Sequence, residues 1–155
     1  MISGKENELY QRAARYCGYQ ERTEKEMREK LRTWGATQKE AAHTIQTLKA
    51  ENFLDEERYV EAFISGKSVA KKWGKRKLST ALTMKGVDQA LIHQGLAAIE
   101  PTAYLQRLRY VADKKKRTLT GATAAQLKQK LTNYLLQKGY EPDLVIQTIQ
   151  DIIVQ

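Results

Sequence analysis

The chain has 155 residues, of which 41% are hydrophobic, and its formal net charge is +9 at pH 7. This size and balance suit a folded protein and exclude a disordered chain. The single cysteine excludes an intrachain disulfide and a cysteine-rich zinc site, and no apolar run reaches the roughly 18 residues of a membrane span. The first nine residues hold charges and no apolar segment, so we expect no signal peptide, no membrane partner and a cytoplasmic protein.

Apolar residues recur at three- and four-residue spacing along the chain, which contains only two prolines. This period predicts an all-α protein. In chain order, residues 6–17, 55–70 and 101–115 are predicted helices. A pair of helices joined by a tight turn is predicted after each of them.

The predicted turns share a pattern centred on Gly35, Gly86 and Gly139. Glycine ends a helix because it adopts the left-handed conformation without a Cβ penalty. A helix-starting residue stands two positions later, namely Thr37, Asp88 or Glu141. Apolar residues recur eight and four positions before each glycine and ten and thirteen after it: Met27, Leu78 and Leu131; Leu31, Leu82 and Leu135; Ile45, Leu96 and Ile149; Leu48, Ile99 and Ile152.

Two capping boxes are predicted, Thr37 with Glu40 and Thr123 with Gln126. The complete pattern predicts three tandem three-helix repeats, about nine helices in all, over residues 1–54, 55–100 and 101–155. A single repeat would have a marginal core, so we expect the repeats to stack into one elongated domain, straight or curved, and the protein to be a monomer.

Residues 62–87 contain seven lysine and arginine residues and no acidic residue. Such charges repel one another unless an anion lies against them, although lysines also occupy ordinary solvated surfaces. On a continuous helix, Lys71, Lys75 and Arg76 would share one face. Trp73 could stack on a base, or it could pack at a helix junction. The predicted binding face, for DNA or another polyanion, consists of Lys67, Lys71, Lys72, Trp73, Lys75, Arg76, Lys77 and Lys85.

A second basic run begins at residue 114 and leads into an acid-free stretch that includes Lys138. Positive charge near a helix end is also favoured by the helix dipole, so contact with phosphate is one of two explanations. The predicted secondary basic patch consists of Lys114, Lys115, Lys116, Arg117, Lys128 and Lys130.

No pattern in the sequence indicates catalysis. The acidic residues 55–57 stand at a predicted helix start, where caps and the dipole favour them. His43 and His93 lack a second ligand at helical spacing, and Cys17 lies on an apolar stripe and is expected in the core. No phosphate-binding loop or nucleophile motif is present. We therefore expect no catalytic residue, metal or cofactor, and no enzymatic activity.

Three segments carry a recognisable pattern: the junction at residues 53–63 (FLDEERYVEAF), the segment 72–87 (KWGKRKLSTALTMKGV) and the opening hairpin at residues 22–31 (RTEKEMREKL). Together they resemble the RecX family of RecA regulators. The resemblance covers roughly residues 9–153. It implies a protein that binds RecA–DNA filaments, lies along their groove and restrains filament growth, ATP hydrolysis and strand exchange.

Two other functions fit the same residues. Charge alone equally supports a helical module that binds single- or double-stranded nucleic acid without a recombinase. A purely structural scaffold is the third alternative. The expected partners of the first hypothesis are a RecA-type recombinase filament and DNA, either directly or within the filament.

Overall fold

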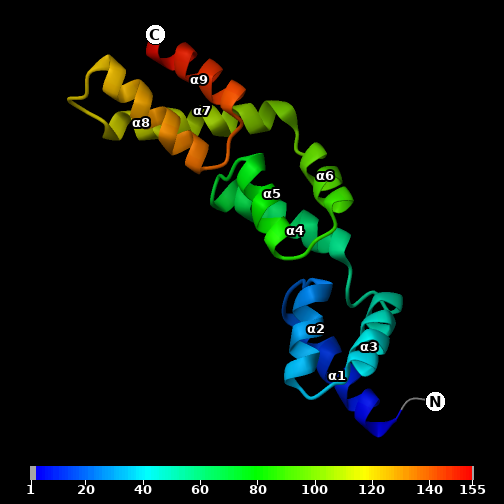
Figure 1. Ribbon diagram of the computed structural model, residues 1–155. Helices are drawn as coiled ribbons and strands as arrows, with labels where there is room; N and C mark the ends of the chain where they lie inside the picture. The colour runs from blue at the N-terminus through cyan, green and yellow to red at the C-terminus, as the bar shows by residue number, and fades with distance from the viewer. Residues whose placement is uncertain (1–2, 155) are drawn as a thin grey trace. The chain divides into compact units, whose positions relative to one another are not determined.

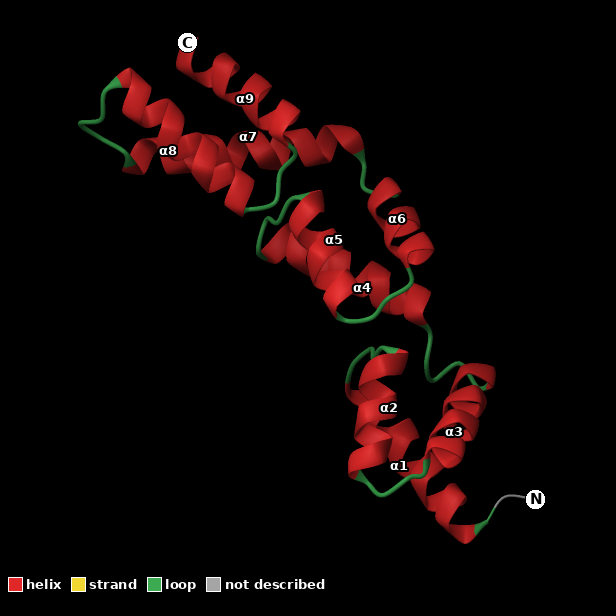
Figure 2. Ribbon diagram, in the orientation of Figure 1, coloured by secondary structure: helices red, strands yellow, loops and turns green. Residues whose placement is uncertain are grey.

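The computed structural model describes residues 3–154, and this part of the chain contains nine helices and no strand (Figure 1, Figure 2). The all-α prediction is therefore confirmed. Within these residues, no helix combines the length and hydropathy needed to span a bilayer. The helices are α1 (Gly4–Tyr19), α2 (Glu24–Thr33), α3 (Gln38–Ala50), α4 (Glu56–Ala70), α5 (Lys75–Met84), α6 (Gln89–Ala97), α7 (Pro101–Thr118), α8 (Ala124–Gln137) and α9 (Pro142–Val154).

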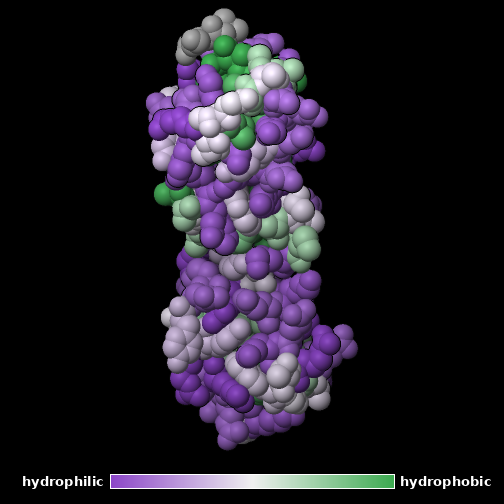
Figure 3. All heavy atoms as spheres, turned by 90° about the vertical axis from the view of Figure 1, so that its left-hand side faces the viewer, coloured by the Kyte–Doolittle hydropathy of each residue, from purple (hydrophilic) through white to green (hydrophobic). Residues whose placement is uncertain are grey.

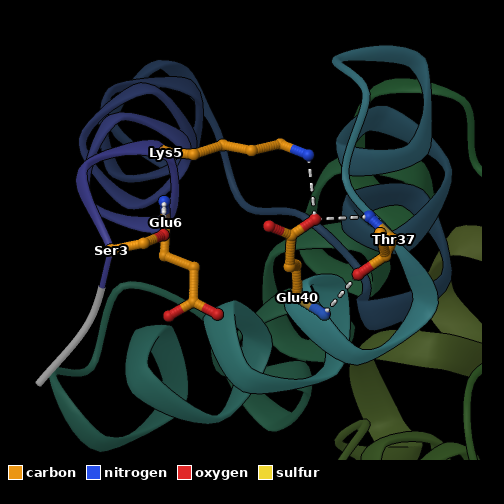
Figure 4. A network of polar contacts seen from close by, with 5 residues as sticks. All are labelled: Ser3, Lys5, Glu6, Thr37 and Glu40. Atoms are coloured by element: carbon orange, nitrogen blue, oxygen red, sulfur yellow. Dashed lines mark hydrogen bonds and ion pairs between the residues drawn. The ribbon is translucent and has the colours of Figure 1, made fainter.

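Side-chain caps fix the predicted helix starts. The Thr37 hydroxyl accepts a hydrogen bond from the Glu40 backbone N–H at 3.1 Å, and the Glu40 carboxylate accepts one from the Thr37 N–H at 2.8 Å (Figure 4). This capping box starts α3 as predicted. Lys5 donates to the same carboxylate at 3.0 Å and thereby links α1 to α3. The second predicted box, Thr123 with Gln126, starts α8.

The repeated glycines end helices as predicted. Gly35, Gly86 and Gly139 have φ values of +91°, +79° and +98°, in the left-handed region that glycine tolerates. Asp88 accepts a hydrogen bond from a backbone N–H at 2.7 Å and starts α6. Of the twelve matched apolar positions, all are buried except Leu96, which is half-buried. The repeat pattern therefore marks the core.

The described residues form two compact units, one of residues 3–63 and 82–92 and one of residues 64–81 and 93–154. In the first unit, α1, α2 and α3 pack together around Leu9, Leu31 and Leu48, and Cys17 is buried among them as expected. In the second unit, α7, α8 and α9 pack against one another and bury Leu135. The three predicted repeat ranges and the elongated stack stay predictions.

Within the second unit, the start of α5 meets the turn between α8 and α9 backbone to backbone. The Gly74 N–H donates to the Lys138 carbonyl at 2.7 Å, and the Arg76 N–H donates to the Gly139 carbonyl at 2.9 Å. A Cβ atom on Gly74 would lie closer than 3.0 Å to backbone atoms of Gly139 and Tyr140. Only glycine therefore fits position 74 without displacing the main chain.

Candidate nucleic-acid interface

Hydrophilic residues predominate on the face of the molecule drawn in Figure 3, and hydrophobic residues form only small groups there. A partner at this face would meet mostly polar and charged groups. Charged and polar groups are therefore the main contacts that this face offers (Figure 3).

Five lysines from three segments of the second unit line one pocket of about 350 Å³. Lys71 and Lys72 come from the loop between α4 and α5, Lys114 and Lys115 from α7, and Lys138 from the residue after α8. No acidic residue lines the pocket, and no ion pair found within residues 3–154 involves these lysines. We name it the lysine pocket. It unites members of both predicted basic sets, which are far apart in the sequence.

Two tyrosines, Tyr110 of α7 and Tyr134 of α8, also line the lysine pocket. Two ammonium groups lie 5.4 and 5.9 Å from the ring centre of Tyr110, and two others lie 4.7 and 5.8 Å from that of Tyr134. Such cation–π contacts hold the lysines near the rings. The pairs are Lys72 and Lys114 with Tyr110, and Lys115 and Lys138 with Tyr134.

The loop that carries Lys71 and Lys72 is fixed to the turn after α8. The Lys138 ammonium donates to the Lys71 carbonyl at 3.1 Å, and the Tyr140 hydroxyl donates to the Lys72 carbonyl at 2.7 Å. The Gly74 N–H bond to the Lys138 carbonyl holds the same loop from its other end. One rim of the lysine pocket is thereby ordered before any ligand arrives.

The expectation that Lys71, Lys75 and Arg76 share a helical face is wrong. Helix α4 ends at Ala70 and α5 begins at Lys75, so Lys71 lies in a loop. The physical reason is the backbone of Lys72, whose φ of +55° is incompatible with a continuing right-handed helix.

Three other members of the predicted binding face lie together: Lys67 and Lys77 flank Trp73, which is half-buried. The ammonium groups of Lys67 and Lys77 lie 5.3 and 4.6 Å from the centre of its ring. The contacts fit a tryptophan packed at a helix junction, and its stacking on a base stays a prediction. None of these three residues lines the lysine pocket.

The remaining members lie elsewhere. The Lys75 ammonium is 5.1 Å from the ring centre of Tyr104, and Arg76 is exposed at the start of α5. Lys85 belongs to the first unit, where its ammonium lies 6.0 Å from the Phe63 ring centre. The lysine pocket thus brings together only two of the eight residues of the predicted face, Lys71 and Lys72.

The secondary basic patch also divides. Lys114 and Lys115 line the lysine pocket, whereas the Lys116 ammonium donates to the Ile152 carbonyl at 2.9 Å near the end of α9. Lys116 therefore satisfies a carbonyl at a helix C-terminus, a structural role. The other members are exposed outside the pocket: Arg117, Lys128 and Lys130.

The lysine and the two tyrosines of the pocket that were absent from the predicted sets are Lys138, Tyr110 and Tyr134. A signal for them exists in the sequence, because Tyr110 precedes Lys114 by four residues and Tyr134 precedes Lys138 by four. This spacing places a tyrosine and a lysine side by side on a helix.

Two buried tyrosines, Tyr104 and Tyr140, form hydrogen bonds to the segment between α4 and α5 and to the start of α5. The Tyr104 hydroxyl accepts a hydrogen bond from the Lys75 N–H at 2.9 Å and donates to the Glu141 carboxylate. Burial, together with the bond to Glu141, raises the pKa of Tyr104. Burial also raises the pKa of Tyr140 to about 12. Both phenols therefore resist ionisation in the folded protein.

This pair predicts a loss of stability at alkaline pH. The folded protein holds the Tyr140 proton more tightly than the unfolded chain, so the stabilisation is complete below pH 10.0 and disappears as pH rises towards about 12. The free energy of unfolding of Tyr140→Phe should therefore fall less steeply with pH than that of the wild type, by about 1 kcal/mol per pH unit in this window. Urea unfolding of both proteins between about pH 9 and pH 12 measures it. Lysine deprotonation affects both equally, so identical slopes would contradict the prediction.

The acidic residues 55–57 contribute to helix starts, as expected. Asp55 accepts a hydrogen bond from the Arg58 N–H at 3.1 Å at the start of α4, and Glu56 accepts one from the Glu24 N–H at 3.0 Å at the start of α2. Burial raises the pKa of Glu56. Within residues 3–154 no group of three or more side chains is arranged to hold a metal ion.

Sequence models of three RecX three-helix domains match successive segments: the first domain matches residues 10–48, the second 55–96 and the third 102–149. The regulatory protein RecX of Clostridium acetobutylicum is 31% identical over 157 residues, covering 97% of this chain and 72% of that protein. The regulatory protein RecX of Clostridium botulinum is 31% identical over 134 residues, covering 85% of this chain. The match spans 62% of the latter relative's length.

The crystal structure of RecX from Lactobacillus salivarius is similar, with a TM-score of 0.91. The match covers 99% of this chain and 100% of that one at 21% identity. At this identity the likeness shows a shared fold.

Proposed function

The chain belongs to the RecX family, and we propose that it is a non-enzymatic regulator that binds RecA-type recombinase filaments on DNA. Its binding would modulate ATP hydrolysis, filament extension and strand exchange, and thereby recombination and DNA repair. It would act as a monomer in the cytoplasm, where recombinase and chromosomal DNA meet in a bacterium. The names of its relatives and its helical-repeat fold support a regulator rather than an enzyme.

The lysine pocket is the single observation that carries the DNA part of this proposal. Its five lysines line a common cavity that no acidic residue lines, so a bound anion would relieve their mutual repulsion. The phosphate groups on the DNA of a filament are anions of this kind. The remaining exposed basic residues of the two predicted sets would add weaker, longer-range attraction.

A nucleic-acid-binding module that needs no recombinase is the second candidate, and the lysine pocket supports it as well. The two functions differ in what the protein must recognise. A plain DNA binder competes for phosphates along the strand, whereas a filament regulator acts at a limited number of filament positions.

The test is ATP hydrolysis by a RecA-type recombinase on single-stranded DNA at near-physiological salt, titrated with this protein. We expect hydrolysis to fall when this protein is well below the molar concentration of the recombinase. Titration of the same DNA without recombinase is the control and should show weak binding. If inhibition requires enough protein to coat the DNA, the recombinase-independent function is correct instead.

A further inference from the structure

We infer that the lysine pocket holds one unpaired nucleotide of single-stranded DNA, with its base against Tyr110 and the two phosphates that flank its sugar on Lys71 and Lys114. This inference rests on the proposed function, because it names the ligand of the surface that would face the DNA. It goes further by assigning a base-binding side chain and a preference for single strands.

The charges specify the phosphate part. Lys71 and Lys114 are exposed, and both line the pocket. Lys71 lies in the loop before α5, and Lys114 lies on α7. Lys72 and Lys138 already donate to backbone carbonyls at 3.1 Å, at Val69 and Lys71 respectively. Lys71 and Lys114 therefore have more hydrogen-bonding capacity left for a ligand than Lys72 and Lys138 have.

The tyrosine specifies the base part. Tyr110 is 49% exposed although it lines a pocket, so part of its ring is accessible to a ligand. Stacking of a base on an aromatic ring is typical of single-strand binding and tolerates any base, because every base has a π-face. An acidic peptide would satisfy the lysines but would leave this ring without a planar partner.

The size of the pocket favours one unit of a single strand. A volume of about 350 Å³ lies at the lower end of the range of small-ligand sites, roughly 300–1,000 Å³. In a duplex the base faces are stacked inside the helix, so only phosphates could approach the lysines. The loop already fixed by Tyr140 and Lys138 lowers the entropic cost of binding.

The test measures binding of this protein alone to a fluorescent oligothymidylate and to an oligonucleotide of equal length with abasic sites. Wild-type protein should bind the abasic strand about tenfold more weakly, because it lacks the base that stacks. Tyr110→Leu should bind the normal strand about tenfold more weakly and should not distinguish the two strands. Tyr110→Phe keeps the ring and should behave as wild type. Circular dichroism of each variant verifies that it is folded.

Three results would overturn the inference. One is Tyr110→Leu retaining the full preference for the normal strand, and another is a duplex of equal length binding as tightly as the single strand. The third is Tyr110→Leu weakening the affinity for DNA-free recombinase while the oligonucleotide affinity is unchanged, which would identify a protein-binding pocket. Filament inhibition by wild-type protein is measured separately. If the wild-type protein inhibits the filament but does not bind single-stranded DNA, only the inference fails. If the wild-type protein does not inhibit the filament, the proposed function is refuted.

Discussion

Gly74→Ala is expected to lower the free energy of unfolding by about 2–4 kcal/mol. The added Cβ would lie closer than 3.0 Å to backbone atoms of Gly139 and Tyr140, which cannot move aside as a flexible side chain can. Overpacking of this kind costs about 1–3 kcal/mol. Separation of the two segments would also weaken the 2.7 Å bond from Gly74 to Lys138, at about 1 kcal/mol.

Gly66→Ala is the matched control. Gly66 lies inside α4, is exposed, and has no atom within 4 Å of an added Cβ. Alanine should therefore stabilise the helix by about 0.5–1 kcal/mol. Urea unfolding followed by circular dichroism compares the two variants with the wild type. A Gly74→Ala midpoint equal to that of the wild type would contradict the close backbone contact.

The double reversal Lys71→Glu with Lys114→Glu is expected to raise the concentration needed for half-inhibition of recombinase ATP hydrolysis about 100-fold. Each lysine would lose a charge-assisted bond to phosphate, worth about 1.5 kcal/mol, so two lost bonds correspond to about this factor. Both side chains are exposed, and the change reduces like-charge repulsion in the lysine pocket. The fold should therefore persist.

Lys128→Glu with Lys130→Glu is the control for charge. It alters net charge by the same amount at two exposed positions of α8 that lie outside the lysine pocket. We expect only a small change in inhibition, since long-range attraction is screened at physiological salt. Equal losses in the two double variants would mean that general charge, rather than the lysine pocket, carries the interaction.

The helices were predictable because their signals are local. The helix ends are predicted by Gly35, Gly86 and Gly139, and two helix starts are predicted by the capping boxes at Thr37 and Thr123. The buried positions followed from their spacing relative to the glycines, with Leu96 the one that is only half-buried. Each of these features depends on residues within a few turns of helix.

The site was less predictable because its geometry depends on distant residues. Lys71 interacts with Lys138, 67 positions away, and the need for glycine at position 74 arises from the turn at Gly139. The assumption of a continuous helix failed at Lys72, since nothing in a lysine indicates a left-handed backbone. Charge composition identified the basic segments but did not show that only some of their lysines share a pocket.

The most direct test of the filament-regulator proposal is the protein concentration that half-inhibits recombinase ATP hydrolysis when single-stranded DNA is added in excess of the recombinase. A filament regulator recognises recombinase subunits on DNA, so doubling the excess DNA should leave this concentration almost unchanged. A protein that only coats DNA would require about twice as much, in proportion to the added phosphates. That proportional increase would contradict the proposal that this protein regulates recombinase filaments.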